Sequence, residues 1–217
     1  MILTPIPPED LPAALARFAG ALADGPARRA FAAIAATASD RAGGSLAEIH
    51  RQQALDLARR FDMGVMEGAP SAGFSWDGYG LRAETEAYVL LHEVAHWQLA
   101  SPARRRVLDF GLGAGPETGC REAAERAARL FGVAREREEA MASLLGILWE
   151  VALGQPALAS FLDQNWLEGA GSAGAARHFT GVLSMLRGAG FLGPGGQPTM
   201  QLRMASDDEI VDLELAG

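Results

Sequence analysis

The chain has 217 residues, of which 49% are hydrophobic and 21% charged, so it is long enough to bury a core as one domain. Its formal net charge of −8 argues against a protein that binds the phosphate backbone of nucleic acids. A single cysteine excludes an internal disulfide and cysteine-rich zinc modules. No apolar run approaches the ~18 residues of a membrane span, and the N-terminus lacks the features of a secretion signal. We therefore expect a soluble, cytoplasmic protein that binds neither nucleic acid nor membrane, of unknown oligomeric state.

The chain is rich in alanine and leucine and poor in valine, isoleucine and tyrosine, which favours helix over strand. In its first part apolar residues recur at helical spacing, and a segment rich in glycine follows, which favours loop. The spacing predicts helices over 11–22, 26–38 and 45–61. The glycine-rich segment 62–81 predicts a loop with two short strands, 63–66 and 74–76.

The clearest helical pattern of the chain lies over 83–100. Ser101 and Pro102 are typical of a helix start, with serine as the N-cap and proline at the first helical position, so we expect another helix from there. After a glycine-rich loop over 111–119, four more helices are predicted, over 120–132, 134–154, 156–163 and 172–188. The expected fold is mainly α, or α+β with a small sheet, as one domain over 1–200 with an acidic, loose tail over 201–217.

Residues 90–97 carry the motif that indicates chemistry, Leu-Leu-His-Glu-Val-Ala-His-Trp. His92 and His96 are four residues apart, so on a helix both imidazoles project from one face and can bind one metal ion. Glu93 lies about 100° around the helix axis, where a carboxylate activates the metal-bound water of metalloproteases. The alternative is a helix that carries two histidines without a metal. Because hydrophobic residues flank both histidines, we favour a zincin-like metal-binding helix.

Two histidines leave the coordination of a metal incomplete, so a third ligand has to come from elsewhere in the chain. A third histidine six residues after the second is excluded, because that position is Pro102. Cys120, His50, His178 and a carboxylate all remain candidates. The carboxylates at the head of the 134–154 helix stand out, although such charged first turns are usually solvated; they are Glu136, Glu138 and Glu139.

The stretch after the motif resembles the bacterial elongation factor P hydroxylase family. That family's pattern runs His-Glu-x-x-His-Trp, then an alanine, then Ala-Arg-Arg, then Asp-Phe-Gly. The residues of this chain that match it at the same spacing are His92, Glu93, His96, Trp97, Ala100, Ala103, Arg104, Arg105, Asp109, Phe110 and Gly111. The segment Asn-Trp-Leu-Glu-Gly at 165–169 is similar to a further family element, and the likeness covers about residues 75–170.

The resemblance implies a non-haem iron hydroxylase that acts on a modified lysine of elongation factor P or a similar lysine-bearing protein. It implies Fe(II) held by His92, His96 and one glutamate. Counting back from the apolar run that ends at Gly154 puts this glutamate at Glu139, whereas helical phase favours Glu138. We choose Glu139 and keep Glu138 as the alternative. The segment 112–119 departs from the family pattern, which puts the identity of the substrate in question.

Three further residues are candidates for a supporting role. Arg104 and Arg105 can hold a carboxylate or orient Asp109, and Asp109 can act as an outer partner of a ligand histidine, as metal sites usually require. The alternative to an iron hydroxylase is a zinc metallopeptidase with Glu93 as general base, because the same ligands fit zinc with an open water position. A module whose metal only braces the helices is the non-catalytic alternative.

Overall fold

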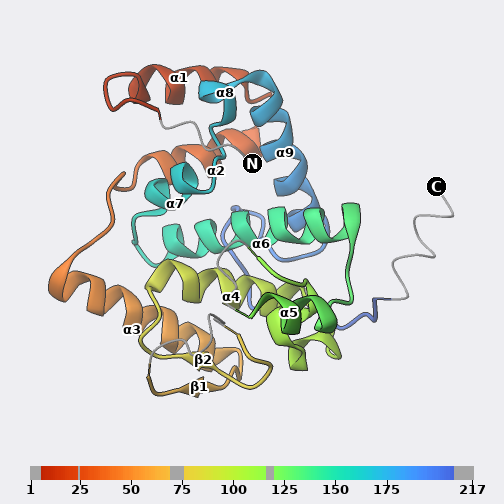
Figure 1. The fold of residues 1–217 in the computed structure, drawn as a ribbon. Helices are drawn as coiled ribbons and strands as arrows, with labels where there is room; N and C mark the ends of the chain where they lie inside the picture. The colour runs from red at the N-terminus through yellow and green to blue at the C-terminus, as the bar shows by residue number, and fades with distance from the viewer. Residues whose placement is uncertain (1–5, 24, 69–75, 116–119, 208–217) are drawn as a thin grey trace, which may run out of the picture. The chain divides into compact units, whose positions relative to one another are not determined.

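The computed structural model describes residues 6–23, 25–68, 76–115 and 120–207. Its fold is mainly helical with one small parallel sheet, which confirms the expected fold class (Figure 1). The chain forms two compact units, Met1–His50 with Ser143–Thr199 and Arg51–Ala142 with Met200–Gly217. Within the described residues no helix combines the length and the apolar character needed to span a membrane. The single domain expected over 1–200 stays a prediction.

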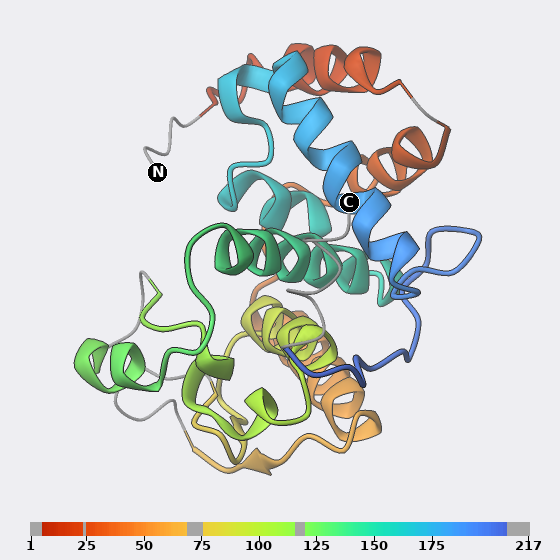
Figure 2. The ribbon, with the colours of Figure 1, turned by 90° about the vertical axis from the view of Figure 1, so that its right-hand side faces the viewer.

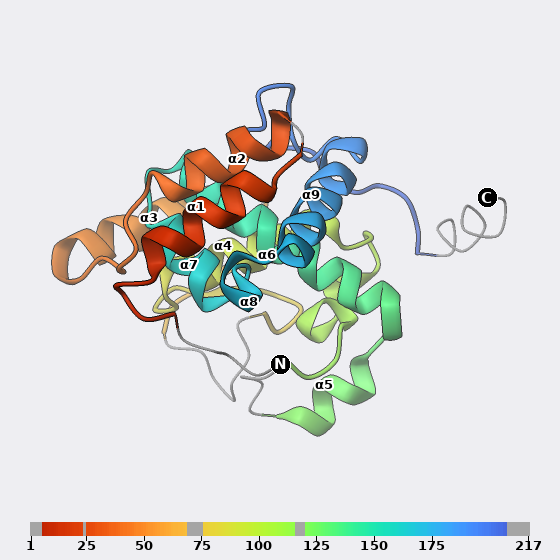
Figure 3. The ribbon, with the colours of Figure 1, turned by 90° about the horizontal axis from the view of Figure 1, so that it is seen from above.

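The first unit packs its helices around a cluster of aromatic rings. Its elements are α1 (Leu11–Ala21), α2 (Gly25–Ala35), the start of α3 (Gly44–Arg60), the end of α6 (Gly132–Ala152), α7 (Ala157–Asp163), α8 (Glu168–Gly171) and α9 (Ala173–Gly188). Helices α1, α2 and α9 lie side by side (Figure 3). The Phe18 ring is fully buried and lies 4.7–5.6 Å from the rings of Phe31, Phe161 and Phe179. This cluster is the core that the helical spacing of apolar residues predicts.

The second unit carries the short sheet and the helix with the histidine motif. Its elements are the end of α3, β1 (Val65–Met66), β2 (Leu81–Arg82), α4 (Ala87–Leu99), the 3-10 turns η1 (Arg104–Arg106) and η2 (Leu108–Gly111), α5 (Arg121–Ala127) and the start of α6. β1 pairs with β2 in parallel, with Val65 opposite Leu81. The predicted strand 63–66 is therefore confirmed in its last two residues. The predicted strand 74–76 lies outside the described residues except for Trp76, which forms a single bridge with Leu81.

The segment after α4 differs from the prediction of a helix that begins at Pro102. Ser101 does accept a hydrogen bond from the N–H of Arg104, at 3.4 Å, as an N-cap would. The chain then makes only the short turns η1 and η2, because Val107 is extended and Asp109 and Phe110 have the positive φ angles 44° and 52°. Left-handed residues cannot continue a right-handed helix. The prediction of a helix is wrong here because local start signals do not report the turn that follows.

Residues 200–207 belong to the second unit and run alongside α4 (Figure 2). The backbone N–H of Arg203 donates to the carbonyl of Gln98 at 2.9 Å, and the Gln98 amide donates to the carbonyl of Gln201 at 2.9 Å. The expected loose tail thus makes contacts with α4 in its first part. Its remainder, 208–217, lies outside the described residues.

Candidate metal centre

Helix α4 places its two histidines on one face. The apolar residues that anchor the helix are fully or almost fully buried: Leu90, Leu91, Val94, Ala95 and Leu99. With these residues in the core, the i, i+4 spacing stacks the two imidazoles one turn apart. The Nε2 atoms of His92 and His96 lie 3.0 Å from each other. The side chain of His96 is buried, whereas that of His92 is 28% exposed.

Glu139, on α6, brings a carboxylate to the two imidazoles. Its Oε2 lies 3.5 Å from Nε2 of His96 and 4.0 Å from Nε2 of His92. Among the residues that the structure describes, these three form the one group of histidine, cysteine or acidic side chains placed to share a metal ion. A circle through the three atoms has a radius of about 2.1 Å, which matches metal bonds of about 2.0–2.2 Å to nitrogen and oxygen. The residues therefore fit a metal, and these bond lengths suit zinc and iron alike.

Glu138, the alternative third ligand, is occupied by another partner. Its carboxylate accepts two parallel hydrogen bonds from the guanidinium of Arg104, the first from Nη1 at 2.9 Å and the second from Nη2. Both side chains are buried, with exposed fractions of 8% and 2%. Helical phase predicts correctly that Glu138 points inward, but the side chain meets an arginine there. The choice of Glu139 over Glu138 agrees with this geometry.

Electrostatics set the protonation of the three candidate ligands. Burial, reinforced by the neighbouring His96, lowers the pKa of His92 to about 3. For His96, burial acts to lower the pKa, but the hydrogen bond and charge of Glu139 outweigh it and the pKa is raised. For Glu139, burial acts to raise the pKa, but the same contact with His96 and the charge of His92 lower it to about 2. His92 is thus neutral with a free lone pair, as a metal ligand must be.

The His96 ring is held from one side by a stack of aromatic rings. Phe110 lies 5.6 Å from it, tilted by 23°, and Trp76 stacks on Phe110 at 5.3 Å, tilted by 5°. Trp76 is fully buried and donates from Nε1 to the carbonyl of Arg105 at 3.2 Å. Phe110 reaches His96 because residues 109–111 all adopt positive φ angles. Such a conformation costs energy for residues other than glycine, and strain of this kind gathers at functional sites.

The other ring nitrogen of His96, Nδ1, is buried and forms no hydrogen bond with any residue that the structure describes. Metal-binding histidines usually donate from this atom to a carboxylate or carbonyl. Asp109, predicted as an outer partner of a ligand histidine, forms no hydrogen bond with this atom of His96; for His92 the role stays a prediction. Asp109 lies in η2, where its backbone N–H donates to the carbonyl of Trp76 at 3.3 Å.

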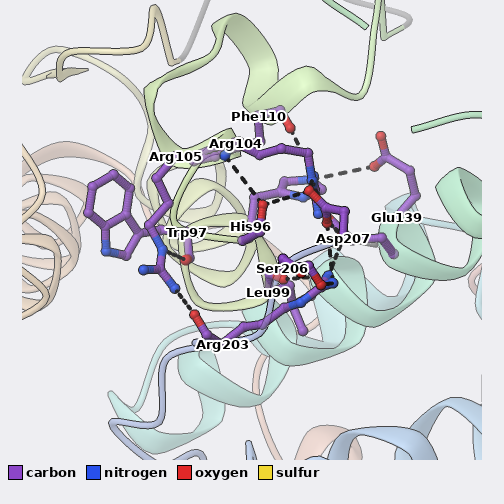
Figure 4. Close-up of polar contacts among 12 residues, drawn as sticks. His96, Trp97, Leu99, Arg104, Arg105, Phe110, Glu139, Arg203, Ser206 and Asp207 are labelled. Atoms are coloured by element: carbon purple, nitrogen blue, oxygen red, sulfur yellow. Dashed lines mark hydrogen bonds and ion pairs between the residues drawn. The ribbon is translucent and has the colours of Figure 1, made fainter. Parts of the chain in front are cut away.

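Arg104 and Arg105, the two predicted supporting arginines, are both buried but bind different groups (Figure 4). Arg104 holds the carboxylates of Glu138 and Asp207, so the prediction that it holds a carboxylate agrees with the structure. Arg105 donates instead to two backbone carbonyls, those of Trp97 at 2.8 Å and Arg203 at 2.6 Å. Arg105 therefore ties the end of α4 to the 200–207 segment.

The remaining candidates do not belong to the cluster. Glu93 is half-buried on α4, and its charge contributes to the raised pKa of His96. Cys120 is exposed. In the first unit, His50 is buried and its carbonyl accepts from Gln155, and the His178 ring stacks on Trp166 at 5.3 Å.

Sequence reasoning missed two contacts near the cluster in the second unit, those of Phe110 and of Asp207. Phe110 matches the family pattern only as part of Asp-Phe-Gly, and its stacking on His96 needs the left-handed turn. Asp207 lies in the acidic stretch expected to be loose, yet it accepts from Ser101 Oγ at 2.6 Å and from Arg104 Nε at 3.0 Å. No local sequence signal marks either contact, because both depend on segments that are distant along the chain.

Comparisons of the chain with protein-family models, with curated proteins and with solved structures find no match. The resemblance to elongation factor P hydroxylases therefore rests on the residues of the chain itself, mainly on 91–111.

Proposed function

We propose that this protein is a non-haem Fe(II)-dependent hydroxylase that adds an oxygen atom to a lysine-type side chain of a protein substrate. The observation that carries the proposal is the meeting of His92, His96 and Glu139 from two helices, with atoms placed around a point about 2.1 Å from each. Two histidines and one carboxylate are the ligand set of non-haem iron oxygenases. Iron bound there would have open positions for the activation of dioxygen.

The exposure of the cluster suits a substrate presented by another protein. His92 is 28% exposed and Glu139 is 40% exposed, so one side of the cluster faces solvent, while His96 forms its buried side. A lysine-type side chain is long enough to reach an exposed cluster of this kind. The half-buried carboxylate of Glu93, which is not one of the three ligands, and the net charge of −8 favour the approach of a cationic group. Elongation factor P or a similar lysine-bearing protein is the substrate that the resemblance suggests, and a translation factor implies a cytoplasmic enzyme.

The proposed reaction replaces one C–H bond of the substrate with C–OH. Dioxygen supplies the inserted oxygen atom, and its second oxygen leaves as water. Two protons and two electrons complete the balance, the electrons coming from an external two-electron donor. Glu93 lies next to His92 on the same turn of α4, and we assign it the transfer of protons at the site.

A zinc metallopeptidase is the second candidate, and the position of Glu93 within the motif favours it. Its carboxylate would then act as the general base for a metal-bound water. The resemblance of residues 91–111 to elongation factor P hydroxylases is what favours the hydroxylase over the peptidase.

Mass spectrometry of elongation factor P that already carries β-lysine tests the proposal. The protein, loaded with Fe(II), is incubated with this substrate, a chemical reductant and ¹⁸O-labelled dioxygen. We expect one labelled oxygen atom on the modified lysine, lost in Glu139→Gln and retained in Glu136→Gln, whose side chain is exposed. Absence of the label from substrate incubated with iron-loaded protein would contradict the proposed reaction. Stoichiometric zinc together with peptide cleavage that disappears in Glu93→Gln would establish the peptidase instead.

A further inference from the structure

The guanidinium of Arg104 is the most buried cationic group in the second unit's described residues, with a side chain that is 2% exposed. Four of its five N–H donors have partners on three separate segments. Nη1 donates to the carbonyl of Phe110 at 2.8 Å and to Glu138, Nη2 donates to Glu138, and Nε donates to Asp207 at 3.0 Å. A buried charge so completely bonded fixes the relative positions of the segments that hold its partners.

The first of these partners, Glu138, lies where α6 enters the core. Residues 132–137 of α6 are exposed or half-buried, and Glu138 is the first buried residue of the helix. The next buried residue is Ala142, one turn later. The ion pair between Arg104 and Glu138 therefore anchors the initial turns of α6. A second contact comes from Arg135, which donates to the carbonyl of Ala114 at 2.8 Å.

Anchoring Glu138 also determines where Glu139 points. Successive residues of an α-helix are about 100° apart around its axis. A bidentate bond to Glu138 resists rotation of the helix about that axis, because both carboxylate oxygens are held in the plane of the guanidinium. With the helix so held, the neighbouring Glu139 carboxylate faces the two histidines, 3.5 Å from His96.

The second partner of Arg104 acts on His96. The Phe110 carbonyl lies in the left-handed turn that puts the Phe110 ring against the His96 imidazole. Since this turn is strained, a bonded acceptor at its centre helps to hold it. The third partner, Asp207, is itself held by Ser101 and Arg203, so that the Nε side of the guanidinium is fixed by the 200–207 segment (Figure 4).

We propose that Arg104 is a positioning residue for the metal triad, acting on Glu139 through Glu138 and on His96 through Phe110. This inference rests on the proposed metal site. It goes beyond that site by assigning the affinity for metal in part to a side chain that is not a ligand. Outer partners of metal ligands typically contribute about 10- to 100-fold to metal affinity, and that range is the effect expected for the Arg104–Glu138 pair.

Cobalt(II) titration of the full chain tests the assignment, with absorption by the bound ion as the signal and a competing chelator to set the scale. The variants are Arg104→Lys, which keeps the charge but loses the bidentate fork, and Glu138→Gln, which keeps the shape but loses the charge. Their matched controls are Arg126→Lys, on a side chain that is 72% exposed, and Glu136→Gln, on an exposed side chain two residues before Glu138. Circular dichroism at the titration temperature establishes that each variant is folded.

We expect one cobalt per wild-type chain, and an affinity about 10- to 100-fold weaker in both test variants and unchanged in both controls. The absorption spectrum at saturating cobalt should also change in Glu138→Gln, because Glu139 no longer faces the ion correctly. The double variant, Arg104→Lys with Glu138→Gln, should bind cobalt with about the affinity of whichever single variant has the lower affinity, since the two residues act as one unit.

Folded variants that bind cobalt with wild-type affinity and spectrum would overturn the positioning role, even if their stability is reduced. If Arg104→Lys does not fold, Glu138→Gln decides alone, because it leaves Arg104 with its partners Asp207 and Phe110. A wild-type chain that binds no cobalt would overturn the metal site itself, and the positioning role with it. The two failures are thus distinguished by the wild-type titration.

Discussion

Glu150 should make the stability of the protein fall as the pH rises from about 4.5 to 7. The carboxyl lies on the part of α6 that belongs to the first unit, and its side chain is 3% exposed. Burial is the main cause of a pKa raised to about 7, only partly offset by the hydrogen bond with Ser160 and the charge of Arg41 at 3.9 Å. The native state therefore holds the proton of Glu150 more tightly than the unfolded chain does.

The sign and size of the effect follow from proton linkage. Below pH 4.5 both states are protonated, and Glu150 has no differential effect on folding. Between 4.5 and 7 the unfolded chain loses the proton while the native state keeps it, so the free energy of unfolding falls with pH. Above pH 7 Glu150 is ionised in the native state as well, and the native state bears the full cost of burying its charge. The pKa rises from 4.5 to about 7, so at about 1.4 kcal/mol per unit of pKa the total is about 3–4 kcal/mol.

Urea unfolding of wild type and Glu150→Gln at pH 5 and pH 8 measures this effect. Glutamine does not titrate, so the stability of Glu150→Gln relative to wild type should rise by about 2–3 kcal/mol from pH 5 to pH 8. Glu168→Gln, at an exposed position of the same unit, serves as the control and should show no such change. A stability difference between Glu150→Gln and wild type that is the same at both pH values would refute the reasoning.

Two further substitutions test the packing of the first unit. Phe18→Ala removes a fully buried ring from the aromatic cluster and should lower the free energy of unfolding by about 3–5 kcal/mol in urea titration; a loss under about 1 kcal/mol would contradict the cluster. Gly171→Ala should lower the melting temperature, because Gly171 has a φ of +81° and a Cβ there would lie 2.5 Å from the carbonyl oxygen of Ala14. An unchanged melting temperature would show that this close approach is wrong.

The helices and the histidine face could be predicted from the sequence because both depend on local spacing. The i, i+4 separation of His92 and His96 places them together on any helix, and the apolar period places α1, α2, α7 and α9 within a few residues of their observed bounds. These features need no knowledge of the rest of the chain.

The third member of the cluster, Glu139, could not be predicted from local spacing. Helical phase indicates that Glu138 faces inward, and this is correct, but phase does not reveal what an inward side chain meets. The buried Arg104 takes Glu138, and the adjacent Glu139 reaches the histidines. An arginine 34 positions away in the chain decides between neighbouring glutamates, and only the fold brings it there.

The contacts of Asp207 and the turn at Asp109 were missed for a related reason. An acidic C-terminal stretch resembles a solvated tail in composition, and no local pattern indicates that Ser101 and Arg104 donate hydrogen bonds to Asp207. The start signals at 101–102 are followed by a left-handed turn, which Asp109 tolerates because aspartate enters that region more readily than most residues. Tertiary contacts decide both outcomes.

The metal content of protein purified and reconstituted without oxygen tests the central claim most directly. Wild-type protein incubated with Fe(II) and then desalted should retain one iron per chain by elemental analysis. The variant Glu139→Gln and the pair His92→Ala with His96→Ala should retain none, while Glu136→Gln retains one. Iron bound equally by wild type and by the folded double-histidine variant, or by neither, would contradict a metal centre built from His92, His96 and Glu139.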